Sequence, residues 1–312
     1  MTDERTGADV SGELEPHRRR AFAIAYRMIG SVAEAEDVVQ ETLLRFHRAR
    51  ADVASPSAFV ATVATRLAVD HLRSARVRRE HYVGDWLPEP LVESVEGDPA
   101  QRAELVESLS VAFLAVLERL SPEQRAVLLL RDVFGYGYDE IAGILERSEP
   151  NVRQLAVRAR RHVREARPRF AVSAQQHERL ASSFFAAVEH GDIQALEAVL
   201  AEDVVLRGDG GGKVPALARS ILGRDHVART LLAWARMGVR FGGAIQPVTV
   251  NGGPGALIAD GDGRLIGVWA LDIGADGVHG VASIVNPEKL RHLGQVGSIT
   301  AALASVARTR PT

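Results

Sequence analysis

The chain has 312 residues, of which 46% are apolar and 25% are charged, and this composition is ordinary for a globular protein of two or three domains. It contains no cysteine, which excludes disulfides, thiolate metal ligands and thiol nucleophiles. The net charge is only −2, no apolar run is long enough to span a membrane, and the first residues lack the apolar core of a signal peptide. We therefore expect a soluble, cytoplasmic protein that needs no cofactor or metal and no membrane.

A helix is predicted from Ser31 to about Arg50, because Ser31 and Glu34 form a capping box at its start. Its buried stripe consists of Ala35, Val39, Leu43 and Phe46. A second face carries Asp37, Gln40, Glu41 and Leu44. A polar face with one exposed leucine fits either a solvated surface or a protein partner.

The next helix is predicted to begin at Ser55-Pro56, where serine caps the helix and proline occupies its first turn. One face of this helix presents the polar side chains of Thr62, Arg66, Arg73 and Arg76. A basic stripe of this kind can follow a phosphate backbone.

The segment that follows, up to about residue 107, is acidic and irregular, and it includes Trp86, Leu87 and Pro88. Its prolines favour an extended linker that docks through the indole ring of Trp86. A helix from Glu104 to Leu120 follows, and Ser121 to Gln124 then combine a serine cap, a first-turn proline and the glutamine of a capping box.

Residues 137–164 have the pattern of a helix-turn-helix. The second helix has a single apolar stripe formed by Val152, Leu155, Ala156, Ala159 and Val163. Its polar candidates for DNA contact are Ser148, Asn151, Arg153, Gln154, Arg158, Arg160 and Arg161. Arginine can contact guanine and phosphate, and Asn or Gln can contact adenine. A merely arginine-rich surface helix is the alternative. Glu146 stands in the turn, where glycine would be easier, so a positive φ there would cost on the order of 1 kcal/mol.

Residues 173–312 predict an α+β domain with helices first and an antiparallel sheet later. The helices are expected at 178–190 and 194–200, and the strands at 204–206, 244–250, 256–258, 265–273 and 278–285.

Three stretches in this order resemble the extracytoplasmic-function (ECF) class of the sigma-70 family: residues 35–46, residues 67–73 and residues 121–164. The resemblance implies a sigma region 2 at 16–83, an acidic linker at 84–103 and a sigma region 4 at 104–169. It also implies that Asp37, Gln40, Glu41 and Leu44 dock on the β′ clamp helices of core RNA polymerase. Thr62, Arg66, Arg73 and Arg76 would then read the −10 promoter element, and the helix-turn-helix would read the −35 element. Arg66 departs from the family pattern, which commonly has Asn there. We expect the acidic linker to run through a basic channel of the polymerase.

The remainder resembles the SigJ-like subgroup, in which a SnoaL-like α+β cone domain is fused at the C-terminus, here at 173–295. The predicted fold class is therefore multidomain, with two all-α domains followed by an α+β cone. The resemblance implies regulation in cis, and the expected contacts between domains are Trp86, Leu87, Pro88, Asp209, Gly210, Gly211, Gly212, Lys213, Asn286 and Pro287. Three consecutive glycines allow a close approach of backbones, although a flexible loop is the alternative.

Two other functions remain open at the level of sequence. Related cone domains catalyse isomerisation or cyclisation, for which the titratable candidates here are Asp209, Asp225, His226, Asp272 and His279. They form no recognisable triad, so we expect no enzyme, but the cone can still bind or transform a small apolar ligand. The second alternative is a helix-turn-helix repressor that acts without polymerase.

Overall fold

The computed structural model describes the backbone of residues 5–79, 82–93, 109–166 and 174–308, and their side chains except at residues 5–13, 52, 75–79, 93, 166, 174, 307 and 308. The chain divides into a helical unit, Met1–His81 with Val116–Arg167, and a sheet unit, Tyr82–Ala115 with Pro168–Thr312. No helix of the described ranges is both long enough and apolar enough to cross a membrane.

The helical unit contains six helices within the described ranges: α1 (Arg5–Ile29), α2 (Val32–Ala49), α3 (Pro56–Arg79), α6 (Pro122–Leu128), α7 (Tyr138–Leu145) and α8 (Glu149–Ala166). The short turns η1 (Arg50–Asp52, 3-10) and η2 (Leu129–Val133, π-helical) follow α2 and α6, and α5 (Val111–Leu117) crosses from the sheet unit into the helical unit. The predicted serine caps at Ser31 and Ser121 are confirmed. Ser31 Oγ accepts from the Glu34 N–H at 3.3 Å, which is one half of the capping box expected there, and Ser121 and Gln124 form a complete capping box.

A buried arginine connects the first helices of this unit to the last ones. The Arg125 guanidinium, 3% exposed, donates to the carbonyls of Met28 at 2.6 Å and Leu117 at 2.7 Å, and it pairs with Glu118 at 2.7 Å. A charged group can be buried when it is paired and hydrogen-bonded in this way. The end of α1 is therefore tied to the start of α6, and this connection places α3 and α7 within reach of each other.

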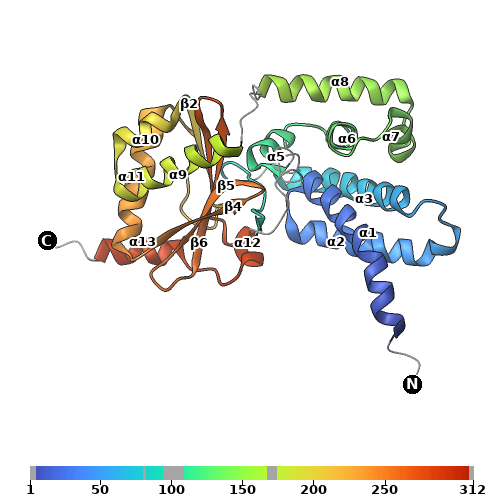
Figure 1. Ribbon diagram of the computed structural model, residues 1–312, viewed down its shortest axis with the longest axis horizontal. Helices are drawn as coiled ribbons and strands as arrows, with labels where there is room; N and C mark the ends of the chain where they lie inside the picture. Colours follow the sequence, from blue (N-terminus) through green and yellow to red (C-terminus); the bar gives the residue numbers. More distant parts are fainter. Residues whose placement is uncertain (1–4, 80–81, 94–108, 167–173, 309–312) are drawn as a thin grey trace. The chain divides into compact units, whose positions relative to one another are not determined.

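The sheet unit is a seven-stranded sheet with the order β1-β4-β5-β6-β7-β2-β3. The strands are β1 (Val92–Glu93), β2 (Leu200–Asp209), β3 (Ile221–Leu222), β4 (Ala244–Val250), β5 (Gly253–Ala259), β6 (Leu265–Gly274) and β7 (Gly277–Ile284). The helices are α9 (Ala174–His190), α10 (Ile193–Val199), α11 (Arg224–Arg240), α12 (Pro287–Leu290) and α13 (Ile299–Arg308), with a 3-10 turn η3 (Arg291–Leu293). Helices α9, α10 and α11 pack together on the sheet, where Phe184, Leu196 and Leu231 share a core with Trp269 of β6 (Figure 1).

The predicted order of helices followed by an α+β domain is confirmed, but three details were wrong. The sheet is mixed, because β2 and β7 pair in parallel, which is possible since the long intervening chain forms the crossover. Helices α11 and α13 and the short strands β1 and β3 were not predicted. The helix expected from Glu104 to Leu120 corresponds, in the described part of the chain, only to α5.

Candidate nucleic-acid interface and linker anchor

Helix α8 is held by its apolar stripe and by the turn before it. Val152, Ala156, Ala159 and Val163 are buried and Leu155 is half-buried, as predicted. Glu146 adopts φ 54° in the turn between α7 and α8. A left-handed non-glycine residue costs about 1 kcal/mol, so the turn is held by the packing on either side of it.

The side chains of α8 that were predicted to contact DNA differ in their exposure and in whether they already bond other residues of the chain. Six of them are exposed: Ser148, Asn151, Arg153, Gln154, Arg158 and Arg161. Arg160 is half-buried, donates from Nε to Asp132 Oδ2 at 2.9 Å and reaches the Tyr138 hydroxyl at 3.2 Å. The hydrogen bond to Asp132 raises the pKa of Arg160 further above its usual range. Arg160 therefore stabilises the domain as well as carrying charge.

Two neighbours on α8 refine this surface. Arg153 pairs with Glu149 at 2.5 Å and lies over the Tyr138 ring at 4.4 Å, so its guanidinium is oriented before any ligand arrives. Val157 is 63% exposed among these polar residues and was not predicted. An exposed apolar side chain on a helix of this kind suits the methyl group of thymine. In the sequence, Val157 could have been recognised as an apolar residue that lies outside the buried stripe of α8.

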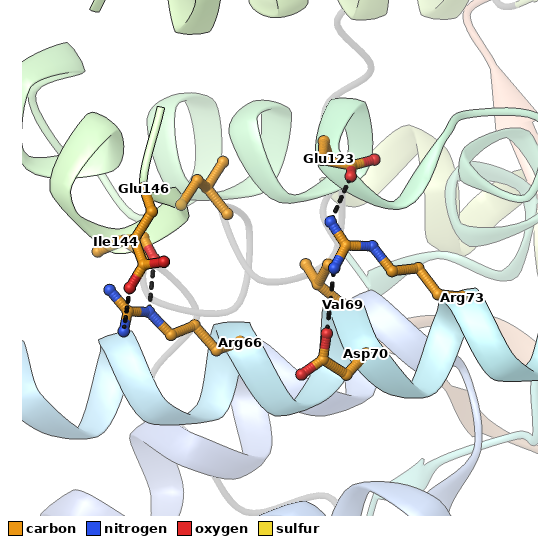
Figure 2. Close-up of a pocket in the computed structure, with 8 residues that line it drawn as sticks. Arg66, Val69, Asp70, Arg73, Glu123, Ile144 and Glu146 are labelled. Atoms are coloured by element: carbon orange, nitrogen blue, oxygen red, sulfur yellow. Dashed lines mark hydrogen bonds and ion pairs between the residues drawn. The ribbon is translucent and has the colours of Figure 1, made fainter. Parts of the chain in front are cut away.

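The predicted −10 face of α3 contacts the helix-turn-helix within the helical unit (Figure 2). Arg66 donates to the carbonyls of Ile144 at 2.8 Å and Gly143 at 3.1 Å, and it pairs with Glu146 at 2.9 Å. Arg73 pairs with Glu123 at 2.6 Å and with Asp70 at 3.2 Å. All of these residues except Gly143 line a small cavity of ≈ 160 Å³.

Arg66 and Arg73, which were expected to face DNA, therefore already have partners within the protein. The side chains of Arg66 and Arg73 remain 44% and 50% exposed, and exposed ion pairs of this kind contribute only about 0–1 kcal/mol. The ion pairs of Arg66 with Glu146 and of Arg73 with Asp70 can therefore be exchanged for a phosphate at low cost, whereas the hydrogen bonds of Arg66 to the two carbonyls and the pair of Arg73 with the less exposed Glu123 would add to that cost. Thr62 donates to the Ala58 carbonyl at 2.8 Å within α3, and the side chain of Arg76 lies outside the described residues.

The predicted polymerase-docking face lies on α2. Asp37 and Gln40 are exposed, and Leu44 is 45% exposed although it is a large apolar residue. Glu41 is half-buried and pairs with Arg45 at 2.6 Å. The opposite side of α2 buries Ala35, Val39 and Phe46, so the two faces are separated as expected.

The sheet unit contains a buried carboxylate that holds the segment after residue 81. Asp209, at the end of β2, is 0% exposed. Its Oδ1 accepts from the Tyr82 hydroxyl at 2.5 Å, and its Oδ2 accepts from the Leu87 N–H at 2.8 Å and pairs with Lys289 Nζ at 2.7 Å. We call these contacts, together with Trp86 and Asn286, the Asp209 anchor.

Lys289 and Asn286 complete the Asp209 anchor. Lys289 Nζ also donates to the Leu87 carbonyl and lies 4.2 Å from the centre of the Trp86 ring. Asn286 Nδ2 donates to the Tyr82 hydroxyl at 3.1 Å. Burial of Tyr82 raises the pKa of its hydroxyl above the usual value, and the hydrogen bond to Asp209 raises it further. Tyr82 therefore stays protonated and can donate to the carboxylate.

The three glycines after Asp209 are required by this close packing. Gly211 and Gly212 have φ 59° and 69°, and a Cβ on Gly211 would lie 2.3 Å from Asn286 Nδ2. A Cβ on Gly210 would lie 2.6 Å from the Val214 carbonyl oxygen. Lys213 then pairs with Glu288 at 2.8 Å. The loop is a close backbone contact and not only a flexible connection.

The linker continues along the sheet beyond the Asp209 anchor. Pro88 is buried, the Leu91 N–H donates to Asn251 Oδ1 at 2.9 Å, and His292 Nε2 lies 2.8 Å from the Pro90 carbonyl. Val92 and Glu93 then form β1, which pairs antiparallel with β4 and is itself the edge strand on this side of the sheet. The structure thus brings together Trp86, Leu87, Pro88, the Asp209–Lys213 loop, Asn286 and Pro287, all of which were predicted to meet.

Sequence reasoning did not single out Tyr82 and Lys289 as members of the Asp209 anchor, or Asn251 as the residue that binds Leu91. Lys289 supplies the counter-charge of Asp209, and in the sequence it stands two residues after the predicted contact Pro287. Asn251 has φ 51° in a turn that was recognised only as a turn.

The candidates for catalysis do not gather at one place. Asp209 belongs to the anchor, Asp225 pairs with Arg229 at 2.7 Å, and His279 contacts Asp276 at 2.7 Å and Asp203 at 3.3 Å on the surface. The described part of the sheet unit also contains an apolar cavity of ≈ 590 Å³, which Trp234 and Trp269 help to line, and none of the five candidates lines it.

Comparison with known proteins identifies both helical regions. The family model described as Sigma-70 region 2 matches residues 14–78, and that described as Sigma-70, region 4 matches residues 110–163. The ECF RNA polymerase sigma factor SigJ of Mycobacterium tuberculosis is 40% identical over 251 residues, which cover 79% of this chain and 80% of that protein. The probable ECF RNA polymerase sigma factor SigI of the same species is 34% identical over 287 residues, or 90% and 94% of the two chains.

A solved structure is similar over almost the whole chain. The crystal structure of Mycobacterium tuberculosis extracytoplasmic function sigma factor SigJ aligns with a TM-score of 0.73 and 33% identity, covering 90% of this chain and 98% of that one. The similarity extends through both helical regions and the α+β domain, so the predicted arrangement of fold classes is confirmed.

Proposed function

Because this chain belongs to the extracytoplasmic-function sigma factors of the sigma-70 family, we propose that it binds core RNA polymerase and directs initiation at specific promoters, under the control of its own C-terminal domain. Helix α2 would dock on the β′ clamp helices through Asp37, Gln40, Glu41 and Leu44. Helix α8 would read the −35 element, and α3 the −10 element. Separate, individually weak contacts suffice here, because the polymerase and the chain hold them at promoter spacing.

The proposal that the C-terminal domain controls initiation by its own chain rests on one observation, the Asp209 anchor. A wholly buried carboxylate takes hydrogen bonds from Tyr82 and Leu87 of the linker and an ion pair from Lys289. The linker supplies two of the donors that this buried carboxylate needs, and leaving a buried acceptor without its donor costs about 1–3 kcal/mol, or more for a charged group. Residues 82–93 are therefore firmly bound to the sheet unit.

A linker bound in this way is not available for another surface. The polymerase channel expected to receive the acidic linker competes with the sheet unit for the same residues. The C-terminal domain would then restrain initiation until the anchor opens, and a weaker anchor should give more transcription. This mechanism needs no separate anti-sigma protein.

The test is transcription in vitro with core polymerase and the full-length chain, on a promoter selected from a library. Trp86→Ala removes the ring beside Lys289 but leaves the core of the C-terminal domain intact, so the yield of promoter-dependent transcript should rise. Val83→Ala is the matched control, because Val83 is 64% exposed in the same linker. An equal yield from wild type, Trp86→Ala and Val83→Ala would contradict the regulatory proposal while leaving the role in initiation standing. Absence of any defined transcript would contradict that role itself.

A further inference from the structure

The turn between β4 and β5 is buried, although hairpin turns normally lie at the surface. It consists of Asn251 and Gly252, with φ 51° and 75°, and a two-residue turn of type I′ favours this pair because both residues need a left-handed backbone. The turn alone therefore explains the presence of an asparagine. It does not explain why Asn251 is 0% exposed. The side chain is covered by other parts of the chain.

Two separate stretches of the chain cover this turn. The Leu91 N–H donates to Asn251 Oδ1 at 2.9 Å, and the Asn251 N–H donates to the Leu91 carbonyl at 2.7 Å. Asn251 Nδ2 donates to the Leu109 carbonyl at 3.0 Å, and this hydrogen bond is buried. Leu91 comes before residues 94–108 and Leu109 comes after them. One side chain thus holds both the linker and the residue that stands two positions before α5.

The start of α5 is packed into the core of the sheet unit beside this contact. Val111, the first residue of α5, is 4% exposed and shares a cluster with Leu87 and Val250. Leu109 is 7% exposed. From Val116 onward the same helix belongs to the helical unit, and the whole of α5 lies within the match to Sigma-70 region 4. The sheet unit therefore holds the first turn of a helix that continues into region 4.

The contacts of Asn251 are separate from the Asp209 anchor. The anchor bonds Tyr82 and Leu87 of the linker, whereas Asn251 bonds the chain on both sides of residues 94–108. Asp209 ends β2 and Asn251 follows β4, and strands β5, β6 and β7 lie between these two in the sheet. Opening of the anchor therefore breaks none of the bonds of Asn251.

We propose that Asn251 is a clasp that holds the start of region 4 on the sheet unit independently of the Asp209 anchor. Its oxygen holds the linker and its nitrogen holds the residue before region 4, so Asn251 is a positioning residue. Release of the chain then takes two steps: the anchor frees residues 82–88, and region 4 is freed only when the bonds of Asn251 break as well. The regulatory meaning of the clasp rests on the proposed control by the C-terminal domain.

An aspartate at this position separates the two side-chain bonds, because a carboxylate accepts hydrogen bonds and donates none. In Asn251→Asp one oxygen still accepts from the Leu91 N–H, whereas the other faces the Leu109 carbonyl with no hydrogen between them. Asp is also favoured in this type of turn, so the hairpin keeps its form. Hydrogen–deuterium exchange of the full-length chain at pH 8, resolved to single amides by mass spectrometry, measures the opening of each contact.

Three groups of amides report the anchor and the two sides of the clasp. The Leu87 N–H reports the anchor, and the Leu91 N–H reports the oxygen of the clasp. The N–H groups of Phe113 and Leu114, which bond Ser110, report the start of α5.

We expect Asn251→Asp to speed exchange at the start of α5 at least about tenfold, because a buried acceptor loses its donor, and to leave Leu91 unchanged. Trp86→Ala should speed exchange at Leu87 and leave the start of α5 as in the wild type. Gln246→Glu is the matched control, since it makes the same change from amide to carboxylate at an exposed position of β4, and it should alter neither site.

Asn251→Gly keeps the test decisive if the aspartate variant does not fold. Glycine adopts the left-handed backbone without steric cost and removes both side-chain bonds, so exchange should rise at Leu91 and at the start of α5 together. Unchanged protection of the start of α5 in the Asn251 variants, or its loss in Trp86→Ala, overturns the clasp. The measurement uses neither polymerase nor DNA, so its result is independent of whether the chain initiates transcription.

Discussion

The buried pair of Asp209 and Lys289 makes a quantitative prediction about the stability of the sheet unit. In Lys289→Met the aliphatic stem is kept and the ammonium is lost, so a carboxylate that is 0% exposed loses its counter-charge. Removing one partner of a buried ion pair costs about 3–5 kcal/mol. The lost contact between Lys289 and the Trp86 ring acts in the same direction. Because domains are typically stable by only about 5–15 kcal/mol, this change removes a large part of the total.

The assay is urea unfolding followed by tryptophan fluorescence. All three tryptophans, Trp86, Trp234 and Trp269, belong to the sheet unit, so the signal reports that unit alone. With a urea dependence of about 2 kcal/mol per molar, the midpoint should fall by about 2 M.

Lys213→Met is the matched control for this measurement. The Lys213–Glu288 pair is about half-exposed on both sides, with relative exposures of 51% and 50%, so its loss should cost at most about 1 kcal/mol. The double variant Asp209→Asn with Lys289→Met removes both charges and should be more stable than Lys289→Met alone. If Lys289→Met and Lys213→Met shift the midpoint equally, the reasoning about the buried pair is refuted.

Three further predictions concern promoter contact, polymerase docking and pH. Arg158→Ala should weaken binding to promoter duplex and lower the magnitude of the slope of log affinity against log salt by about 1, which a salt titration measures; an unchanged slope would show that Arg158 contacts no phosphate. Reversing the charge of both Asp37 and Glu41 to Lys should abolish co-purification with core polymerase, and retained binding would remove α2 from the docking surface. In the folded protein the pKa of Tyr82 is raised, so the folded state favours the protonated hydroxyl. The stability that Tyr82 contributes is therefore complete below the pKa that it has in the unfolded chain, about 10, and is lost as the pH rises above that value. Tyr82→Phe should therefore reduce the loss of sheet-unit stability between pH 9 and about 11, seen by the same fluorescence, and an identical loss in both proteins would assign it to Lys289 or other groups.

Local signals in the sequence predicted local structure well. The caps at Ser31 and Ser121 depend on residues three apart, and the stripe of α8 depends on spacings of three and four residues, so both are legible without knowledge of the fold. Helix α11 was missed although Val227, Leu231 and Trp234 have helical spacing.

Pairings between distant residues could not be predicted in the same way. Arg66 was expected to be free for DNA, but it bonds the Ile144 carbonyl, 78 residues away in the chain. Lys289 meets Asp209 across 80 residues. Such pairs depend on how elements pack, and the sequence pattern of either residue alone is that of a surface charge. The resemblance to a family placed the Gly-rich loop and the Asn-Pro turn together, whereas the ion pair at their centre required the structure.

The two residues of β1 have a consequence for the sheet when the linker leaves. Val92 and Glu93 pair only with the end of β4, opposite Val250 and Thr249. Pro247, in the middle of β4, has no N–H that could bond another strand. Unpaired edges invite strand addition from other chains, and proline is one of the residues that discourage it. Release of the linker therefore leaves the main-chain groups of Thr249 and Val250 without their β1 partners, while Pro247 limits how far another strand could pair along β4.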